Sequence, residues 1–169
     1  YVFVYTIWLK RKTPQNIVIG GASGALPPVI GWAIATNSIS LESIAFFLII
    51  FFWTPSHFWA LSLYKADDYK KAGIPMLPVT NGIQDTKKNI LIYSLLMIPA
   101  IIFPYYIGFV SEVFLSLSLL FTFYYNLICY QLYNYKVGKF NIKKARHIFS
   151  YSIIYLFLIF VFFLVDKII

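Results

Sequence analysis

The sequence predicts an all-α bundle of membrane-spanning helices, and three observations lead to that fold class. Hydrophobic residues make up 60% of the chain and charged residues only 12%, whereas a soluble domain carries about 25% charged residues. Apolar runs recur at the length of about 20 residues that crosses a bilayer. No alternating pattern typical of strands is visible. We therefore expect one polytopic membrane domain over residues 1–169, embedded in a lipid bilayer.

The apolar runs are separated by short polar segments, and each run predicts one spanning helix. They cover residues 17–36, 43–63, 89–109, 113–134 and 148–166. Residues 1–9 have the composition of the last turns of a further helix. We expect about five complete helices and a partial one.

The first run is rich in glycine and proline. Its glycines are Gly20, Gly21, Gly24 and Gly31. Small residues four apart let helix backbones approach closely, and the Pro27-Pro28 pair removes two backbone donors. We expect a tightly packed helix, or a bent one that opens a cavity wall, and the two are compatible. Pro99 and Pro104 are expected to break the third run similarly.

Basic residues gather in alternate connections between the runs. Thirteen of the fourteen lie there: Lys10, Arg11 and Lys12, then Lys65, Lys70, Lys71, Lys87 and Lys88, then Lys136, Lys139, Lys143, Lys144 and Arg146. The other connections hold Glu42 and Glu112. If successive helices alternate in direction, the basic loops share one side, which the positive-inside rule places in the cytoplasm or the mitochondrial matrix.

Two function classes are excluded by composition. The net charge of +8 comes from these short loops between apolar runs, so we expect no nucleic-acid partner. The one cysteine, Cys129, excludes an internal disulfide framework and a multi-cysteine zinc site.

The segment FWTPSHFWALSLYKADDYKKAGIPMLPV, residues 52–79, contains the main candidate site. Ionisable groups beside a membrane span are costly and indicate function. Trp53, His57, Tyr64 and Asp68 recur at helical spacing and would share one face. If the helix continues unbroken, His57 lies roughly 16 Å deeper than Asp68. This face suits a substrate with a charged head and an apolar body.

Several interpretations of these residues stay open. His57 is a group hydrogen-bonded to a neighbouring helix, a contact to substrate such as a metal-bearing macrocycle, or a catalytic base. Asp67 and Asp68 form a solvated helix end paired with Lys65 or Lys71. Alternatively, because basic residues lie on the same membrane face, the two acids bind a metal beside counter-charges for a diphosphate.

Three segments of the chain resemble a known family. They are YTIWLKRKTPQNIVIGGASGALPPVIGW (5–32), TPSHFWALSLYKADDYKKAGIPMLPV (54–79) and ARHIFSYSIIYLFLIF (145–160). They are similar to the protoheme IX farnesyltransferases, or heme O synthases, of the UbiA-type intramembrane prenyltransferases. The resemblance implies a nine-helix bundle around a central cavity, of which this chain would hold the last five helices.

The chain departs from the two aspartate-rich motifs of the family that it resembles. The family's first motif, Asn-x-x-x-Asp-x-x-x-Asp, would precede Tyr1, so we expect this piece alone to be inactive. In the second motif, Asp-x-x-x-Asp, Lys65 stands in place of the first Asp, and Ser56 stands where a proline is common.

The implied activity joins farnesyl diphosphate to a vinyl group of heme B, giving heme O for cytochrome oxidase. The resemblance implies that Lys10 and Arg11 hold the diphosphate, and that Asp68, with Asp67 second, binds Mg²⁺. Lys65 and Lys71 would contact the diphosphate or those acids, and Tyr69 would orient the site. Tyr64 and His57 would contact substrate, with His57 against the heme. The implied catalytic residues are Asp68, Lys65 and Tyr69. Residues 73–79 are expected to form a lid.

The resemblance further implies the enzyme's surroundings. We expect an integral protein of a bacterial inner membrane, with the mitochondrial inner membrane as the alternative, and association with the heme A synthase step. Rival interpretations are another UbiA-type enzyme that prenylates an aromatic acid such as 4-hydroxybenzoate, and a transporter or respiratory-complex subunit. The latter would carry polar groups near mid-membrane, whereas the ionisable residues here concentrate at one face.

Overall fold

The computed structural model describes residues 12–135 and 142–168, and regular structure in these ranges is entirely helical. The helices are α1 (Asn16–Gly24), α2 (Pro27–Thr36), α3 (Leu41–Tyr64), α4 (Ala66–Lys71), α5 (Leu77–Thr80), α6 (Gly82–Tyr106), α7 (Glu112–Tyr133) and α8 (Ile142–Ile168). Five segments are long and apolar enough to span a membrane, with α1 and α2 together forming the first. The predicted all-α polytopic bundle is confirmed.

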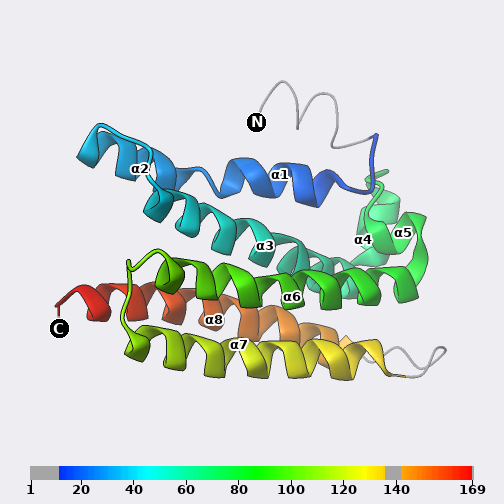
Figure 1. Cartoon of the computed structure of the whole chain (residues 1–169). Coiled ribbons are helices and arrows are strands. Elements are labelled where there is room, and N and C mark those ends of the chain that lie inside the picture. The colour runs from blue at the N-terminus through cyan, green and yellow to red at the C-terminus, as the bar shows by residue number, and fades with distance from the viewer. Residues whose placement is uncertain (1–11, 136–141, 169) are drawn as a thin grey trace.

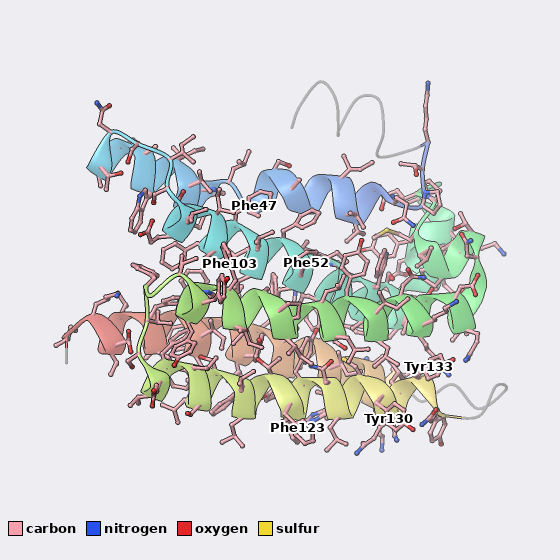
Figure 2. All side chains as sticks on the ribbon, in the orientation of Figure 1. Phe47, Phe52, Phe103, Phe123, Tyr130 and Tyr133 are labelled. Atoms are coloured by element: carbon pink, nitrogen blue, oxygen red, sulfur yellow. The ribbon has the colours of Figure 1, made fainter. Side chains whose placement is uncertain are left out.

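The long helices lie side by side with alternating direction, and α1 and α2 run along α3 (Figure 1). Two apolar clusters fill the interior. One surrounds Trp59 near α4 and α5, and the other contains Ile49, Tyr155 and Phe163 toward the opposite end. Large apolar side chains also cover the outside, such as Phe123, which is 70% exposed on the outer side of α7 (Figure 2). An outer surface of this kind suits contact with lipid chains rather than water.

The proline pair divides the first span into two helices. Pro27 and Pro28 occupy the first two positions of α2, where a missing N–H costs nothing because those donors have no partner within the helix. The predicted bend therefore takes the form of a break after α1. Close packing is found at Gly21, where an added Cβ would lie 3.0 Å from Thr54 Cγ2, but Gly24 and Gly31 face open space.

The prediction that Pro99 and Pro104 break the third span is wrong. Helix α6 passes through both without interruption. Each proline removes one backbone donor, and neighbouring helices commonly compensate for that loss inside membrane bundles. Helix α6 is held between α3 and α7 along its length.

Helices α6 and α8 begin several residues earlier than the hydropathy pattern predicted. Lys87 and Lys88 lie inside α6, and Lys143, Lys144 and Arg146 lie inside α8, so the prediction that they occupy loops is wrong. Apolar runs mark only the hydrocarbon core, whereas lysine and arginine continue a helix well and extend their charges toward water. These residues still lie at the same end of the bundle as α4 (Figure 1). We call this the basic end.

Lys87 shows how a basic side chain can be buried there. It is only 2% exposed, and its ammonium donates to the Tyr135 carbonyl at 3.0 Å. A buried charge needs such a partner. The bond ties the start of α6 to the segment that follows α7.

Candidate functional site

The junction of α3 and α4 forms the centre of the basic end. Helix α3 ends at Tyr64, because Lys65 adopts φ −112° and ψ 17°, and α4 then starts at Ala66. The premise of an unbroken helix from His57 to Asp68 is therefore wrong, and the depth calculated from it does not hold. Asp68 belongs to a separate short helix.

Helix α4 carries acids in its first turn and lysines in its last. Asp67 and Asp68 precede Lys70 and Lys71. In this order the charges interact favourably with the helix dipole. Asp68 Oδ2 lies 3.0 Å from Lys65 Nζ. The hydrogen bond from Lys65, with its charge, lowers the pKa of Asp68 below the ordinary 3.8. Of the alternatives that the sequence left open, pairing of Asp68 with Lys65 is thus present.

The donor set of α4 fits a metal only in part. Side chains of adjacent helical residues point about 100° apart, so Asp67 and Asp68 do not converge. Residues 12–135 and 142–168 contain no group of three or more His, Cys, Asp or Glu able to hold a metal. Mg²⁺ is commonly bound by one or two carboxylates together with substrate phosphates. The acids of α4 fit that arrangement and not a metal site made of protein alone.

A glycine-dependent cap ends α4. The Ile74 amide donates to the Tyr69 carbonyl at 3.1 Å and the Gly73 amide to the Lys70 carbonyl at 3.2 Å, which is a Schellman motif. Gly73 has φ +66°, a conformation that favours glycine. The cap turns the chain sharply back toward the bundle.

The segment after the cap is anchored. Met76, Leu77 and Pro78 are buried, and the first two belong to the apolar cluster around Trp59. The expected lid over residues 73–79 stays a prediction, and its opening would expose these apolar side chains. Tyr69 packs against the same cluster, and burial raises the pKa of its phenol above 10.0.

The inner face of α3 meets α8 through aromatic rings. The Tyr64 and Phe149 ring centroids are 6.1 Å apart, and the Arg146 guanidinium carbon lies 5.5 Å from the Tyr64 ring centre. Such a contact between a cation and a ring face is attractive. Arg146 therefore joins the site. Sequence reasoning assigned it only to a basic loop, because nothing local to it indicates a partner more than 80 residues earlier.

His57 lies between two helices and is 6% exposed. Its Nδ1 is 2.6 Å from Ser152 Oγ on α8. Its ring stacks on Trp53 at 4.3 Å and on Phe149 at 4.5 Å. The hydrogen bond to a neighbouring helix, one of the three alternatives for His57, is present. A contact of His57 with substrate stays a prediction.

Hydroxyl pairs inside the bundle were missed by sequence reasoning. Ser56 Oγ lies 2.8 Å from Tyr125 OH, and Thr122 Oγ1 lies 2.8 Å from Tyr155 OH. Both pairs are buried. Ser56, which departs from the resembled pattern, thus has a bonding role that a proline could not supply. The recurrence of hydroxyl residues in two apolar runs is the signal that could have indicated such pairs.

The remaining predicted residues are distributed as follows. Lys71 is exposed at the end of α4. Lys10 and Arg11 lie outside the described residues, so their predicted contact with diphosphate stays a prediction.

Five spanning helices with a charged junction over an aromatic interior define a polytopic membrane protein whose charged side chains gather at one end above apolar surfaces. The sequence profile of the UbiA prenyltransferase family matches residues 1–153. The chain belongs to this family.

Several named relatives are close to this chain in sequence. The chain is 76% identical to a protoheme IX farnesyltransferase of Pelagibacter ubique, over 99% of this chain and 55% of that protein. It is 48% identical to one of Parvibaculum lavamentivorans, over 99% of this chain and 52% of that protein. With one of Azorhizobium caulinodans the identity is 51%, over 95% of this chain and 52% of that protein. The chain thus spans about half the length of these relatives. No solved structure matches it.

Proposed function

We propose that this chain forms part of a protoheme IX farnesyltransferase, which transfers the farnesyl group of farnesyl diphosphate to a vinyl group of heme B and yields heme O. The observation that carries the proposal is the 76% identity to a relative of that name over nearly the whole chain. The basic end supports it, because an allylic diphosphate needs fixed cations beside an apolar channel. Farnesyl diphosphate and heme B are the proposed substrates.

The proposed reaction breaks the allylic carbon–oxygen bond, whose electron pair leaves with the diphosphate. The vinyl π electrons form a carbon–carbon bond from the terminal vinyl carbon to the farnesyl carbon. Water then adds to the positive charge left on the other vinyl carbon and releases a proton, which leaves a hydroxyl there. Negative charge grows on the leaving group, so fixed cations aimed at it lower the barrier. Lys65 and Lys71 would serve this role on α4, together with Lys10 and Arg11.

The acids of α4 would hold Mg²⁺ jointly with diphosphate oxygens, Asp68 first and Asp67 second. When bound, the ion would neutralise charge on the leaving group. Because Asp68 already pairs with Lys65 at 3.0 Å, the lysine would orient the carboxylate before substrate arrives. Tyr69 would fix the position of α4, since its ring packs against the core.

The aromatic face of α3 and α8 would hold the apolar part of the substrates. A farnesyl cation must be shielded from water until it reacts, and aromatic ring faces stabilise cations. Tyr64 and His57 lie on this face, with Phe149 between them. His57 would contact the heme.

We further propose that the protein resides in a bacterial inner membrane with its basic end in the cytoplasm, as the positive-inside rule favours. Heme O would then pass to a heme A synthase, with which association is proposed. The proposed association rests on the proposed activity.

The activity is tested with Asp68→Asn in the full-length protein, reconstituted in membranes with Mg²⁺, farnesyl diphosphate and heme B. We expect heme O formation, measured by mass spectrometry, to fall about 100-fold, the order lost with one stabilising group. The matched control is Asp85→Asn, an exposed acid of α6 at the same end, which should keep normal turnover. Near-normal turnover in Asp68→Asn would contradict the role of Asp68. Prenylation of 4-hydroxybenzoate instead of heme B would contradict the proposed acceptor.

A further inference from the structure

The imidazole of His57 is fixed on three sides by α3 and α8. Trp53 covers one ring face at 4.3 Å, and Phe149 covers the other at 4.5 Å. Ser152 Oγ meets Nδ1 at 2.6 Å. The Phe58 ring also packs against the imidazole at 5.0 Å, with the two ring planes at 81°. The ring is therefore oriented, and its Nε2 has no hydrogen bond to any residue in 12–135 or 142–168.

The bonds of Ser152 determine which nitrogen carries the proton. Ser152 Oγ lies 2.7 Å from the Phe149 carbonyl oxygen. Two oxygens at that distance repel unless a proton lies between them, and a carbonyl can only accept. The single hydroxyl proton is thus directed to Phe149. Ser152 Oγ must then accept from His57, so Nδ1 bears the proton and Nε2 has a free electron pair.

A second bond keeps Ser152 at this height. The indole N–H of Trp53 donates to the Ser152 carbonyl at 2.8 Å. Trp53 precedes His57 by one helical turn. The same tryptophan therefore stacks on the imidazole and donates a hydrogen bond to Ser152, the residue that accepts the Nδ1 proton of His57. The arrangement fixes the ring and its tautomer together.

We propose that Ser152 is a positioning residue that holds His57 as the Nδ1–H tautomer, so that Nε2 is presented as an electron-pair donor to the iron of bound heme. This inference rests on the proposed function for its ligand. The tautomer itself rests only on the contacts of Ser152. Metal-binding histidines are commonly oriented in this way, by a partner that accepts from the other ring nitrogen.

The tautomer is measured by ¹⁵N NMR of the full-length protein labelled at histidine, with His57→Gln used to assign the His57 signals. In the heme-free protein we expect Nδ1 to be protonated and Nε2 not. Ser152→Ala should shift the population toward the Nε2–H form. The matched control is Ser150→Ala, an exposed serine of the same helix, which should leave the signals unchanged. A protonated Nε2 in the unmodified protein, or a population unaffected by Ser152→Ala, would overturn the proposal.

The ligand is measured by titration with heme B, followed by its absorption spectrum. We expect Ser152→Ala to weaken binding about 10-fold, the lower range for loss of a partner that orients a metal-binding histidine, and Ser150→Ala to have no effect. An unchanged spectrum and affinity in both His57→Gln and Ser152→Ala would overturn the iron contact. Heme O formation by the unmodified enzyme tests the proposed function separately. If that function is wrong, the unmodified enzyme makes no heme O, whichever tautomer His57 adopts.

Discussion

Lys65 shows how one residue sets the electrostatics of the basic end. It stands where the resembled motif has an acid, and it pairs with Asp68 at 3.0 Å. Both side chains are largely exposed, so the pair adds little to stability. Its effect is local, because it lowers the pKa of the Asp68 carboxyl and fixes where the carboxylate points.

This pairing gives a prediction about pH. Lys65 lowers the pKa of Asp68 below 3.8, so replacing Lys65 by Met should raise it toward that value. A lowered pKa in the folded state means that the pair's stabilisation is present above the ordinary pKa and is lost as pH falls through the lowered one. The pKa is measured by a ¹³C NMR titration of the Asp68 carboxyl. Lys70→Met serves as control and should change it little. An unshifted pKa in Lys65→Met would show that the pair does not form in solution.

Sequence spacing could not identify hydrogen-bond partners that lie far apart in the chain. The spacing of Trp53, His57 and Tyr64 correctly indicated one face of α3. Nothing in that spacing identifies Ser152, which lies 95 residues after His57. A hydrogen bond between helices depends on how they pack, and hydropathy does not encode their relative rotation.

At the scale of helices, apolar runs located all five spans but not where α6 and α8 begin. The predicted start of the fifth span, residue 148, misses the first six residues of α8, which begins at Ile142. Basic residues lower hydropathy without ending a helix, so a hydropathy criterion stops too early. Proline content, by contrast, predicts a helix break where none occurs. Pro99 leaves α6 intact, whereas Pro27 begins a new helix. The position of a proline within a helix decides its effect.

The packing of α1 on α3 gives a second prediction. Gly21→Ala places a methyl group 3.0 Å from Thr54 Cγ2, and we expect a loss of about 1–3 kcal/mol from overpacking. Thr54→Ser removes that methyl but keeps the hydroxyl that donates to the Ile50 carbonyl. The double variant should therefore recover part of the loss, because Thr54 Cβ, 3.2 Å from the added methyl group, remains in serine.

Denaturant unfolding of the full-length protein in detergent measures these differences. Gly24→Ala is the control, because its added Cβ has no atom within 4 Å and alanine favours a helix. It should be neutral or slightly stabilising. Equal losses in Gly21→Ala with and without Thr54→Ser would mean that the contact with Thr54 Cγ2 does not cause the loss.

At the scale of the whole molecule, the chain separates its charges by end. The alternating helices place α4, the start of α6 and the start of α8 together (Figure 1). At the other end, Asp166 accepts from the Ser111 amide at 3.1 Å, and Lys167 donates to the Phe109 carbonyl. Asp166 and Lys167 thus join α8 to the loop before α7, and the other charged side chains that the structure describes at that end are the acids Glu42 and Glu112. The basic end keeps exposed lysines and acids, which suits it to an anionic ligand.

This separation predicts which residues can be labelled from each side of a membrane. Single cysteines are introduced at Lys70 and Gln84 of the basic end and at Ser38 and Glu112 of the other, all exposed positions, in full-length protein without its other reactive cysteines. Native Cys129 is fully buried and should stay silent. With a membrane-impermeant maleimide, Ser38→Cys and Glu112→Cys should react in intact bacterial cells. Lys70→Cys and Gln84→Cys should react only after permeabilisation. If Lys70→Cys and Gln84→Cys react in intact cells and the other two only after permeabilisation, the proposed orientation is contradicted. If Lys70→Cys and Gln84→Cys react from opposite sides of the membrane, the fold is contradicted.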